Sequence, residues 1–259
     1  MDEQREQIKN IIEKLHNISK QPGKEWLLSE LMVHFGNDAK ITEIYEYCIE
    51  NVLKNQAAEF YKDFPLRRIV PQLEKDFIRM ETFRRQNKFE EFSMAVYQQI
   101  ENITNEIWKD ERLYEITTKM MNHPFHIEGK QHGKPIGELI LIGYKSDKTI
   151  DKYGAMDLIY CVLYFLCYEA MSKYNKIYDF YQHKNLFNWI YQFRNLNHRN
   201  GKPSDSQKNI IETVNTNKSI YYFKFAEALL FYIEGVEKGL GKLEELHIYA
   251  MGEKRWMLK

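Results

Sequence analysis

Glycine, proline and net charge are all scarce in this chain. Only 12 glycines and 6 prolines occur among its 259 residues, which argues against an all-β fold built on many tight turns and favours long helices. Lysine plus arginine and aspartate plus glutamate each number 37, so the formal net charge is zero. A globally basic nucleic-acid-binding protein is therefore not indicated, and only local basic segments can be considered for such a role.

The sequence also lacks a disulfide framework, a secretory signal and an apolar run of membrane-spanning length. Its three cysteines form no CxxC pair, and we expect Cys161 and Cys167 to be core thiols of a protein in the reducing cytoplasm. The first ten residues (MDEQREQIKN) are charged and contain no signal-peptide core. The longest apolar run covers residues 158–168, well short of the roughly 20 residues that a membrane span needs. We therefore predict a buried helix there and no membrane partner.

Apolar residues recur at helical spacing along most of the chain, and hydrophobic residues make up an ordinary 44% of it. The strongest patterns predict four core helices, at about 88–109, 154–173, 176–199 and 219–237. The connection between the second and third is short, which makes these two helices antiparallel neighbours. The sequence therefore predicts an all-α fold with a four-helix bundle as its core.

Around this core the sequence predicts a helical extension, an insertion and a tail. The predicted divisions are an N-terminal helical extension at 1–85, the bundle at 86–240 and a C-terminal tail at 241–259. An insertion at about 122–152 contains four of the twelve glycines, and its segment 138–144 (ELILIGY) is short and apolar. We expect a small hairpin or an irregular excursion in this insertion, and a polar loop at about 202–217.

The residues best suited to chemistry gather at the end of the third core helix, within residues 190–203 (IYQFRNLNHRNGKP). Gly201 is the residue type that commonly follows a helix, and Pro203 prevents its continuation. Arg194 and His198 stand four apart, so on a helix they share one face. A guanidinium and an imidazole side by side can hold a phosphate and move a proton near it.

A purely structural explanation exists for the same turn, because basic side chains near the end of a helix complement its dipole. Two observations favour a functional role instead. Asn195 and Asn197, which have weak helix propensity, occupy this turn as well. The segment 181–208 also holds five lysines and arginines against one acid, Asp205, in a chain that is neutral overall.

A helical bundle whose third core helix ends in Arg-Asn and a nearby His resembles the HEPN superfamily. The resemblance covers roughly residues 85–240, and it rests on Arg194 and Asn195 as the first motif positions and on His198 as the last. Three residues separate Arg194 from His198, one fewer than the usual minimum in the family. The resemblance implies a bundle that is frequently dimeric, and a metal-independent ribonuclease of the kind found in toxin–antitoxin, abortive-infection and CRISPR-associated systems.

The resemblance also implies roles for individual residues. His198 is expected to act as general acid or base, Arg194 to hold the phosphate and Asn195 to orient the pair, while the RNA 2′-hydroxyl attacks the neighbouring phosphate. The residues expected to contact RNA are Tyr191, Asn197, Arg199 and Lys202. The implied partners are RNA, a second copy of the chain and an antitoxin or other regulatory protein, with no cofactor.

A second polar cluster holds His123, His126, Glu128 and His132 within ten residues. Its spacing matches no familiar metal site, no cysteine or carboxylate motif accompanies it, and Pro124 disfavours a regular helical histidine pair. We therefore expect a loop or polar surface here and no metal.

Three interpretations of function stay open at this point. The first is a HEPN-like endoribonuclease of defence or toxin type, which requires that neither Arg194 nor His198 is buried in a salt bridge inside the bundle. The second keeps the fold without the chemistry, as a non-catalytic module that binds RNA or a protein. The third is a helical interaction protein with no nucleic-acid role, which net neutrality suits.

Overall fold

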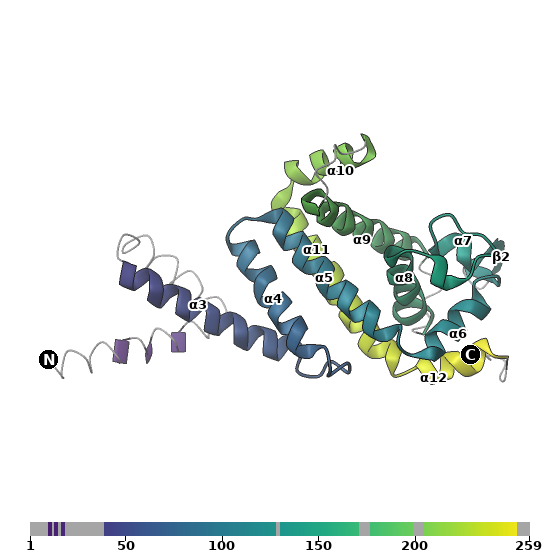
Figure 1. The fold of residues 1–259 in the computed structure, drawn as a ribbon, viewed down its shortest axis with the longest axis horizontal. Coiled ribbons are helices and arrows are strands. Elements are labelled where there is room, and N and C mark those ends of the chain that lie inside the picture. Colours follow the sequence, from purple (N-terminus) through teal and green to yellow (C-terminus); the bar gives the residue numbers. More distant parts are fainter. Residues whose placement is uncertain are drawn as a thin grey trace. The chain divides into compact units, whose positions relative to one another are not determined.

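The structure is a computed structural model of the chain (Figure 1). It describes residues 39–127, 130–170, 177–198 and 205–252, together with residues 10, 11, 13, 14, 17 and 18. Helices dominate this part of the chain, and its strands form a single two-stranded sheet. The predicted all-α fold class is confirmed.

The chain divides into two compact units, residues 1–62 and 63–259. The first unit contributes α3 (Ala39–Phe60), on which Val52, Leu53 and Ala57 are buried. The second unit contains the elements from α4 to α12. It also contains all the residues singled out above for chemistry, so the candidate site can be described within this unit alone.

Four helical segments form the core of the second unit, in the order that the sequence predicts. They are α5 (Phe89–Ile107), α8 (Ala155–Val162) with the π-helix η2 (Leu163–Glu169) that continues it, α9 (Ile177–His198) and α11 (Lys218–Leu240). Helix α5 is central, because it contacts α8, α9 and α11. Cys161 and Cys167 are free and fully buried, as predicted. Within the described residues, no helix has the length and apolar character needed to cross a membrane.

Aromatic rings fill the centre where α5, α9 and α11 meet. Phe89 of α5 packs edge-on against Phe193 of α9, with ring centroids 5.2 Å apart, and lies 5.5 Å from the ring of Phe225 on α11. The hydroxyls of Thr104 and Tyr232 share a buried 2.7 Å hydrogen bond between α5 and α11. Close packing of this kind leaves little freedom for the helices to slide past one another.

Further helices cover the core. Helix α4 (Val70–Arg85) runs beside α5, and α12 (Leu243–Ala250) packs on α6 (Glu111–Met120) (Figure 1). Pro71 lies in the first turn of α4, where a missing amide proton costs no helical hydrogen bond. The chain divides after Lys62, whereas the predicted boundary follows residue 85. The difference arises because α4 buries Leu73 and Met80 and packs along α5 instead of belonging to the extension.

The insertion contains a hairpin, as expected, but not in the segment with the apolar run. Strands β1 (Pro124–Ile127) and β2 (Lys130–Pro135) pair antiparallel. The start of the segment 138–144 lies instead in the short helix α7 (Ile136–Ile140), whose isoleucines are buried, and η1 (Ile150–Lys152) leads on towards α8. An apolar run of this length cannot be assigned to strand or buried helix by periodicity alone.

The predicted polar loop at about 202–217 is wrong for most of its length. Residues Asp205–Thr216 form the helix α10, which contacts α9 and α11. Ile210 and Val214 stand four apart on one face, and Val214 is fully buried. The helix is mostly polar, so its few apolar residues do not stand out as a periodic pattern in the sequence.

Candidate active site

Core packing fixes the last turns of α9. Phe187, Ile190 and Phe193 face the bundle and are almost fully buried, as their spacing of three residues predicts. Phe193 is clamped by rings from α5 and α11. Arg194 directly follows Phe193, so the packing of Phe193 also fixes the backbone of Arg194. The Arg194 side chain itself is half-buried.

The Arg194 guanidinium makes two contacts within the described residues. Its Cζ lies 5.2 Å from the centroid of the Tyr97 ring, over the ring face, and its Nη1 donates a hydrogen bond to Asn195 Oδ1 at 3.1 Å. No carboxylate in the part of the chain that the structure describes lies within ion-pair distance of this guanidinium. For these residues, the condition that Arg194 is not held in a buried salt bridge is met.

Asn195 is a buried polar residue, with 7% of its surface exposed. A buried carboxamide needs hydrogen-bond partners, and its oxygen finds one in the guanidinium of Arg194. Consecutive helical residues diverge by roughly 100° around the axis, so the Arg194 side chain has to bend towards Asn195 for the two to form this hydrogen bond. The hydrogen bond therefore fixes one edge of the guanidinium.

Tyr97 of α5 forms the surface on which the guanidinium rests. Its ring is buried and lies 5.5 Å from the ring of Tyr191 on α9. Its hydroxyl donates to Glu101 Oε1, one turn further along α5, at 3.2 Å. Burial, reinforced by the charge of Glu101 and partly offset by Arg194, raises the pKa of Tyr97. The hydroxyl thus stays protonated at neutral pH and remains a donor.

Sequence reasoning did not identify Tyr97 or Glu101. Tyr97 lies almost a hundred positions before Arg194, so no local motif connects the two. The available signal was a tyrosine beside the apolar stripe of α5, followed four residues later by an acid that it can reach on a helix. That signal indicates the Tyr97–Glu101 hydrogen bond but not the contact with α9.

Two residues of the basic segment 181–208 do not contribute to this site. Lys184 donates to the Leu139 carbonyl at 2.9 Å and lies over the Tyr160 ring. It is ten residues before Arg194, which corresponds to roughly 15 Å along a helix. Lys208 is exposed and pairs with Asp205 at 2.7 Å. The local excess of positive charge at the end of α9 is therefore smaller than the sequence indicates.

The remaining predicted site residues fall at or beyond the end of α9. His198 is its last residue and Asn197 precedes it, but the side chains of both lie outside what the structure describes. Arg199 and Lys202 also lie outside the described residues, as do Gly201 and Pro203. The structure thus brings Arg194 and Tyr191 onto the Tyr97 ring and joins Asn195 to Arg194.

Helix α10 returns along the same end of α9. Gln207 of α10 donates to Gln192 Oε1 at 2.7 Å, and Gln192 donates in turn to Asn188 Oδ1 at 3.2 Å. This chain of carboxamides ties α10 to the α9 turns just before Arg194.

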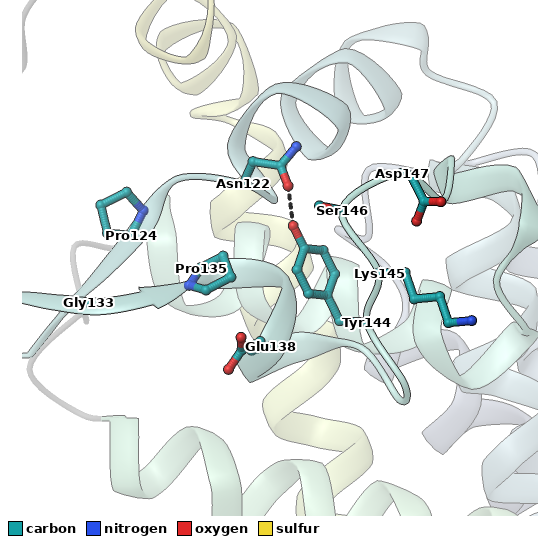
Figure 2. Close-up of a pocket in the computed structure, with 9 residues that line it drawn as sticks. All are labelled: Asn122, Pro124, Gly133, Pro135, Glu138, Tyr144, Lys145, Ser146 and Asp147. Carbon is teal, nitrogen blue, oxygen red and sulfur yellow. Dashed lines mark hydrogen bonds between the residues drawn. The ribbon is translucent and has the colours of Figure 1, made fainter.

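A separate hollow of about 770 Å³ lies in the insertion, between the hairpin and the loop that follows α7. Figure 2 shows the Tyr144 ring at its centre, with the hydroxyl directed at the Asn122 carboxamide, to which it donates a hydrogen bond. The ring also lies so close to Gly137 that a Cβ there would overlap it. The residues lining the hollow are Asn122, Pro124, Gly133, Pro135, Glu138, Tyr144, Lys145, Ser146 and Asp147.

A narrower hollow of about 120 Å³ adjoins the first and shares its Tyr144 wall. The loop between them is braced by Tyr153, whose hydroxyl accepts from the Lys145 amide at 3.0 Å and donates to the Lys145 carbonyl at 3.3 Å. The larger hollow presents carboxylates from Glu138 and Asp147 and only one lysine. It is therefore poorly suited to a phosphate.

The histidine cluster of the insertion is only partly described. Glu128 lies outside the described residues, and so do the side chains of His126 and His132. Among the described residues, no group of three or more histidines, cysteines and acids could hold a metal ion. The absence of a metal at this cluster stays a prediction.

Two charged residues fasten the insertion to the bundle. Asp157 of α8 accepts from the Ile142 amide at 2.7 Å and from the Gly154 amide at 3.3 Å. Lys184 of α9 reaches the Leu139 carbonyl, and burial lowers its pKa. These contacts hold the insertion against α8 and α9.

The comparisons with known proteins add no family to this description. No family model, no curated protein and no solved structure matches the chain. A function therefore has to be argued from the chemistry of the residues at the end of α9.

Proposed function

We propose that the chain is a metal-independent endoribonuclease of defence or toxin type, with a HEPN-like bundle. The observation that carries the proposal is how the Arg194 side chain is held and which of its donors stay free. Its guanidinium is half-buried, held by Tyr97 and Asn195, and engages no carboxylate among the described residues. An arginine held in this way keeps most of its donors for an anion, and a phosphate diester is an anion that a guanidinium binds through two parallel hydrogen bonds.

In the proposed reaction, His198 takes the proton of the RNA 2′-hydroxyl. The 2′-oxygen forms a bond to the adjacent phosphorus, and the bond from phosphorus to the 5′-oxygen breaks. The products are a 2′,3′-cyclic phosphate and a 5′-hydroxyl, whose proton comes from a general acid such as the matching histidine of a second copy. Arg194 offsets the charge that develops on the phosphoryl oxygens, and Asn195 keeps the guanidinium oriented.

The proposal includes a homodimer and an RNA-binding surface around the motif. Two copies of the end of α9 would face one another, and Tyr191, Asn197, Arg199 and Lys202 would contact the RNA strand. Tyr191 is half-buried beside Tyr97, so part of its side chain is accessible to an RNA strand. Sedimentation velocity measures the oligomeric state, and a chain that stays monomeric at micromolar concentration would contradict the dimer.

The proposal is tested by incubating RNA with the wild type, Arg194→Ala and His198→Ala in the presence of EDTA. We expect the wild type to cleave RNA, Arg194→Ala to lose about 10²–10³-fold in rate and His198→Ala about 10²–10⁴-fold. Lys208→Ala is the matched control, because Lys208 is exposed and pairs only with Asp205 among the described residues. Cleavage that persists in both site variants would remove the pair from the mechanism.

A second function is favoured by the motif itself. Only three residues separate Arg194 from His198, and a shortened spacing would misplace the imidazole while leaving the anion-binding guanidinium intact. The alternative is therefore a non-catalytic module that binds RNA or an acidic protein segment through Arg194. It predicts RNA binding by the wild type without cleavage, and weaker binding by Arg194→Ala. Neither cleavage nor binding would favour a helical interaction protein.

A further inference from the structure

Arginine is a flexible side chain, so an arginine that stabilises a transition state has to be held in one orientation. Arg194 has two such restraints in the described residues, the Asn195 carboxamide and the Tyr97 ring. They act differently on its donors. The carboxamide occupies one N–H group of Nη1, whereas contact through the ring face occupies none, because it engages the positive charge of the whole planar group.

The Tyr97 ring is itself fixed on several sides. It is almost fully buried in α5, it lies next to Tyr191, and its hydroxyl is tied to Glu101. A ring restrained in this way provides a flat, partly negative surface in one orientation. The guanidinium that rests on it is confined to a plane, with the donors that are not bonded to Asn195 still available at its edge.

We propose that Tyr97 is a positioning residue, which holds the Arg194 guanidinium through its ring face so that the free N–H edge meets the scissile phosphate. The inference rests on the proposed function, because it assigns Tyr97 a part in the same site. A tyrosine that serves only to pack α5 against α9 would stabilise the bundle without any coupling to Arg194.

The test exploits the electrostatics of the ring while leaving its shape unchanged. Tyr97 is replaced by phenylalanine and by phenylalanine carrying three or five ring fluorines, which progressively remove the negative charge of the ring face. We expect Tyr97→Phe to cleave RNA within about twofold of the wild type. We expect kcat to fall stepwise with fluorination, by about five- to tenfold at five fluorines, with little change in KM, in line with the energy of a partly buried cation–π contact.

A coupling measurement separates positioning from packing. In the Arg194→Ala background, the fluorinated series is expected to have no effect on residual cleavage, because the group that the ring orients is gone. Tyr221→Leu serves as a control for the loss of a buried tyrosine, since the Tyr221 ring packs on Trp189 and Phe225 and not on Arg194. Thermal unfolding confirms that every variant is folded at the assay temperature.

Each outcome has a distinct meaning. A kcat that does not change along the series, or that falls equally with and without Arg194, would overturn the positioning role of Tyr97 while leaving the nuclease intact. Wild-type cleavage that is insensitive to Arg194→Ala would instead overturn the proposed function, and the role of Tyr97 with it. A stepwise fall that needs Arg194 supports the inference.

Discussion

Glu169 places a carboxyl group inside the bundle, at the end of η2. Only 5% of its surface is exposed. Burial raises its pKa from 4.5 to about 7, although a hydrogen bond from Tyr164 partly offsets the effect. On α12, the pKa of Tyr249 is raised as well, mainly by burial and secondarily by the charge of Glu169. The bundle therefore favours the protonated, neutral form of this side chain.

This shift predicts how stability depends on pH. The folded state binds the Glu169 proton more tightly than the unfolded state, so this proton contributes to the free energy of unfolding. The contribution is fully present below about pH 4.5 and is lost as pH rises to about 7. The free energy of unfolding falls by about 3 kcal/mol over this range. Glu169→Gln cannot ionise, so we expect it to be more stable than the wild type by about 2–3 kcal/mol at pH 8 and nearly equal at pH 4.5.

Urea unfolding at the two pH values measures this difference. Glu234→Gln is the control, because Glu234 is half exposed and forms an ordinary pair with Lys238 on the surface of α11. It should shift stability by about 0–1 kcal/mol at both pH values. A gap between Glu169→Gln and the wild type that is the same at pH 4.5 and pH 8 would show that Glu169 does not titrate between them.

At the residue scale, the sequence could indicate only what neighbouring positions share. Arg194 and Asn195 are adjacent, so the sequence already places together the two side chains that share a hydrogen bond in the structure. Tyr97 could not be assigned to the same site, because its contact depends on how α5 and α9 pack, and no spacing in the sequence encodes that register. Lys184 shows that neighbours in the sequence need not share a site. It counts toward the basic segment in the sequence, but in the structure its ammonium group donates a hydrogen bond to the Leu139 carbonyl in the insertion.

At the scale of elements, η2 and α11 approach each other closely. Gly235 and Gly239 of α11 stand four apart and face η2. A Cβ on Gly235 would lie 2.4 Å from Cys167 Sγ, and one on Gly239 would lie 2.5 Å from the backbone oxygen of Leu166. Both distances are shorter than the contacts that Cβ atoms make, so glycine is required here for close packing and not for an unusual backbone angle.

We expect Gly239→Ala to destabilise the protein by about 1–3 kcal/mol, because a backbone carbonyl of the facing element cannot move aside as a flexible side chain can. The same change elsewhere in a helix normally stabilises by roughly 0.5–1 kcal/mol. Gly241→Ala is the matched control, since its Cβ would meet only the Lys238 oxygen at 3.5 Å and its φ of −63° suits alanine. Chemical denaturation measures the free energy of unfolding of both variants. Equal stability of Gly239→Ala and Gly241→Ala would contradict the close approach of η2 and α11.

Helical periodicity predicted the four core helices because each buries a wide apolar face, as α5 does with Phe92, Val96, Ile100 and Ile103. It did not predict α10, which exposes most of its length, or α7, which is shorter than two turns. Nor did it predict that the buried run beyond Val162 continues as a π-helix. All residues of η2 are buried, so the sequence contains no apolar stripe from which its wider turn could be distinguished from an α-helix.

At the scale of the whole molecule, the position of α4 decides where the folded unit begins. Asp76 of α4 is buried and accepts a hydrogen bond from Asn102 of α5 at 3.1 Å. Arg79 reaches Gln98 at 3.0 Å, and the Gln99 amide contacts Met80 Sδ at 3.6 Å. These pairs join the middle of α4 to α5. Helix α4 therefore belongs to the same compact unit as the bundle, although the sequence places it in the extension.

This assignment predicts the behaviour of two truncated chains. Residues 63–259 keep α4, and we expect them to unfold in a single cooperative transition. Residues 86–259 lose α4 and expose the side of α5 that Leu73 and Met80 cover. At about 1.5–3 kcal/mol for each buried side chain, the second chain should be less stable by about 3–6 kcal/mol. This corresponds to a melting temperature lower by roughly 10–20 °C in a protein of this size.

Differential scanning calorimetry of the two chains measures this difference. A variant of the longer chain, Asp76→Ala, provides an intermediate case, because it keeps α4 but removes the acceptor that joins it to Asn102. It should lose about 1–3 kcal/mol, because the hydrogen bonds that the Asp76 carboxylate accepts from Gln72, Arg79 and Asn102 are all removed. Equal melting temperatures for residues 63–259 and 86–259 would show that α4 is not part of the cooperative unit. The boundary after residue 85, which the sequence predicts, would then describe the molecule better than the division after Lys62.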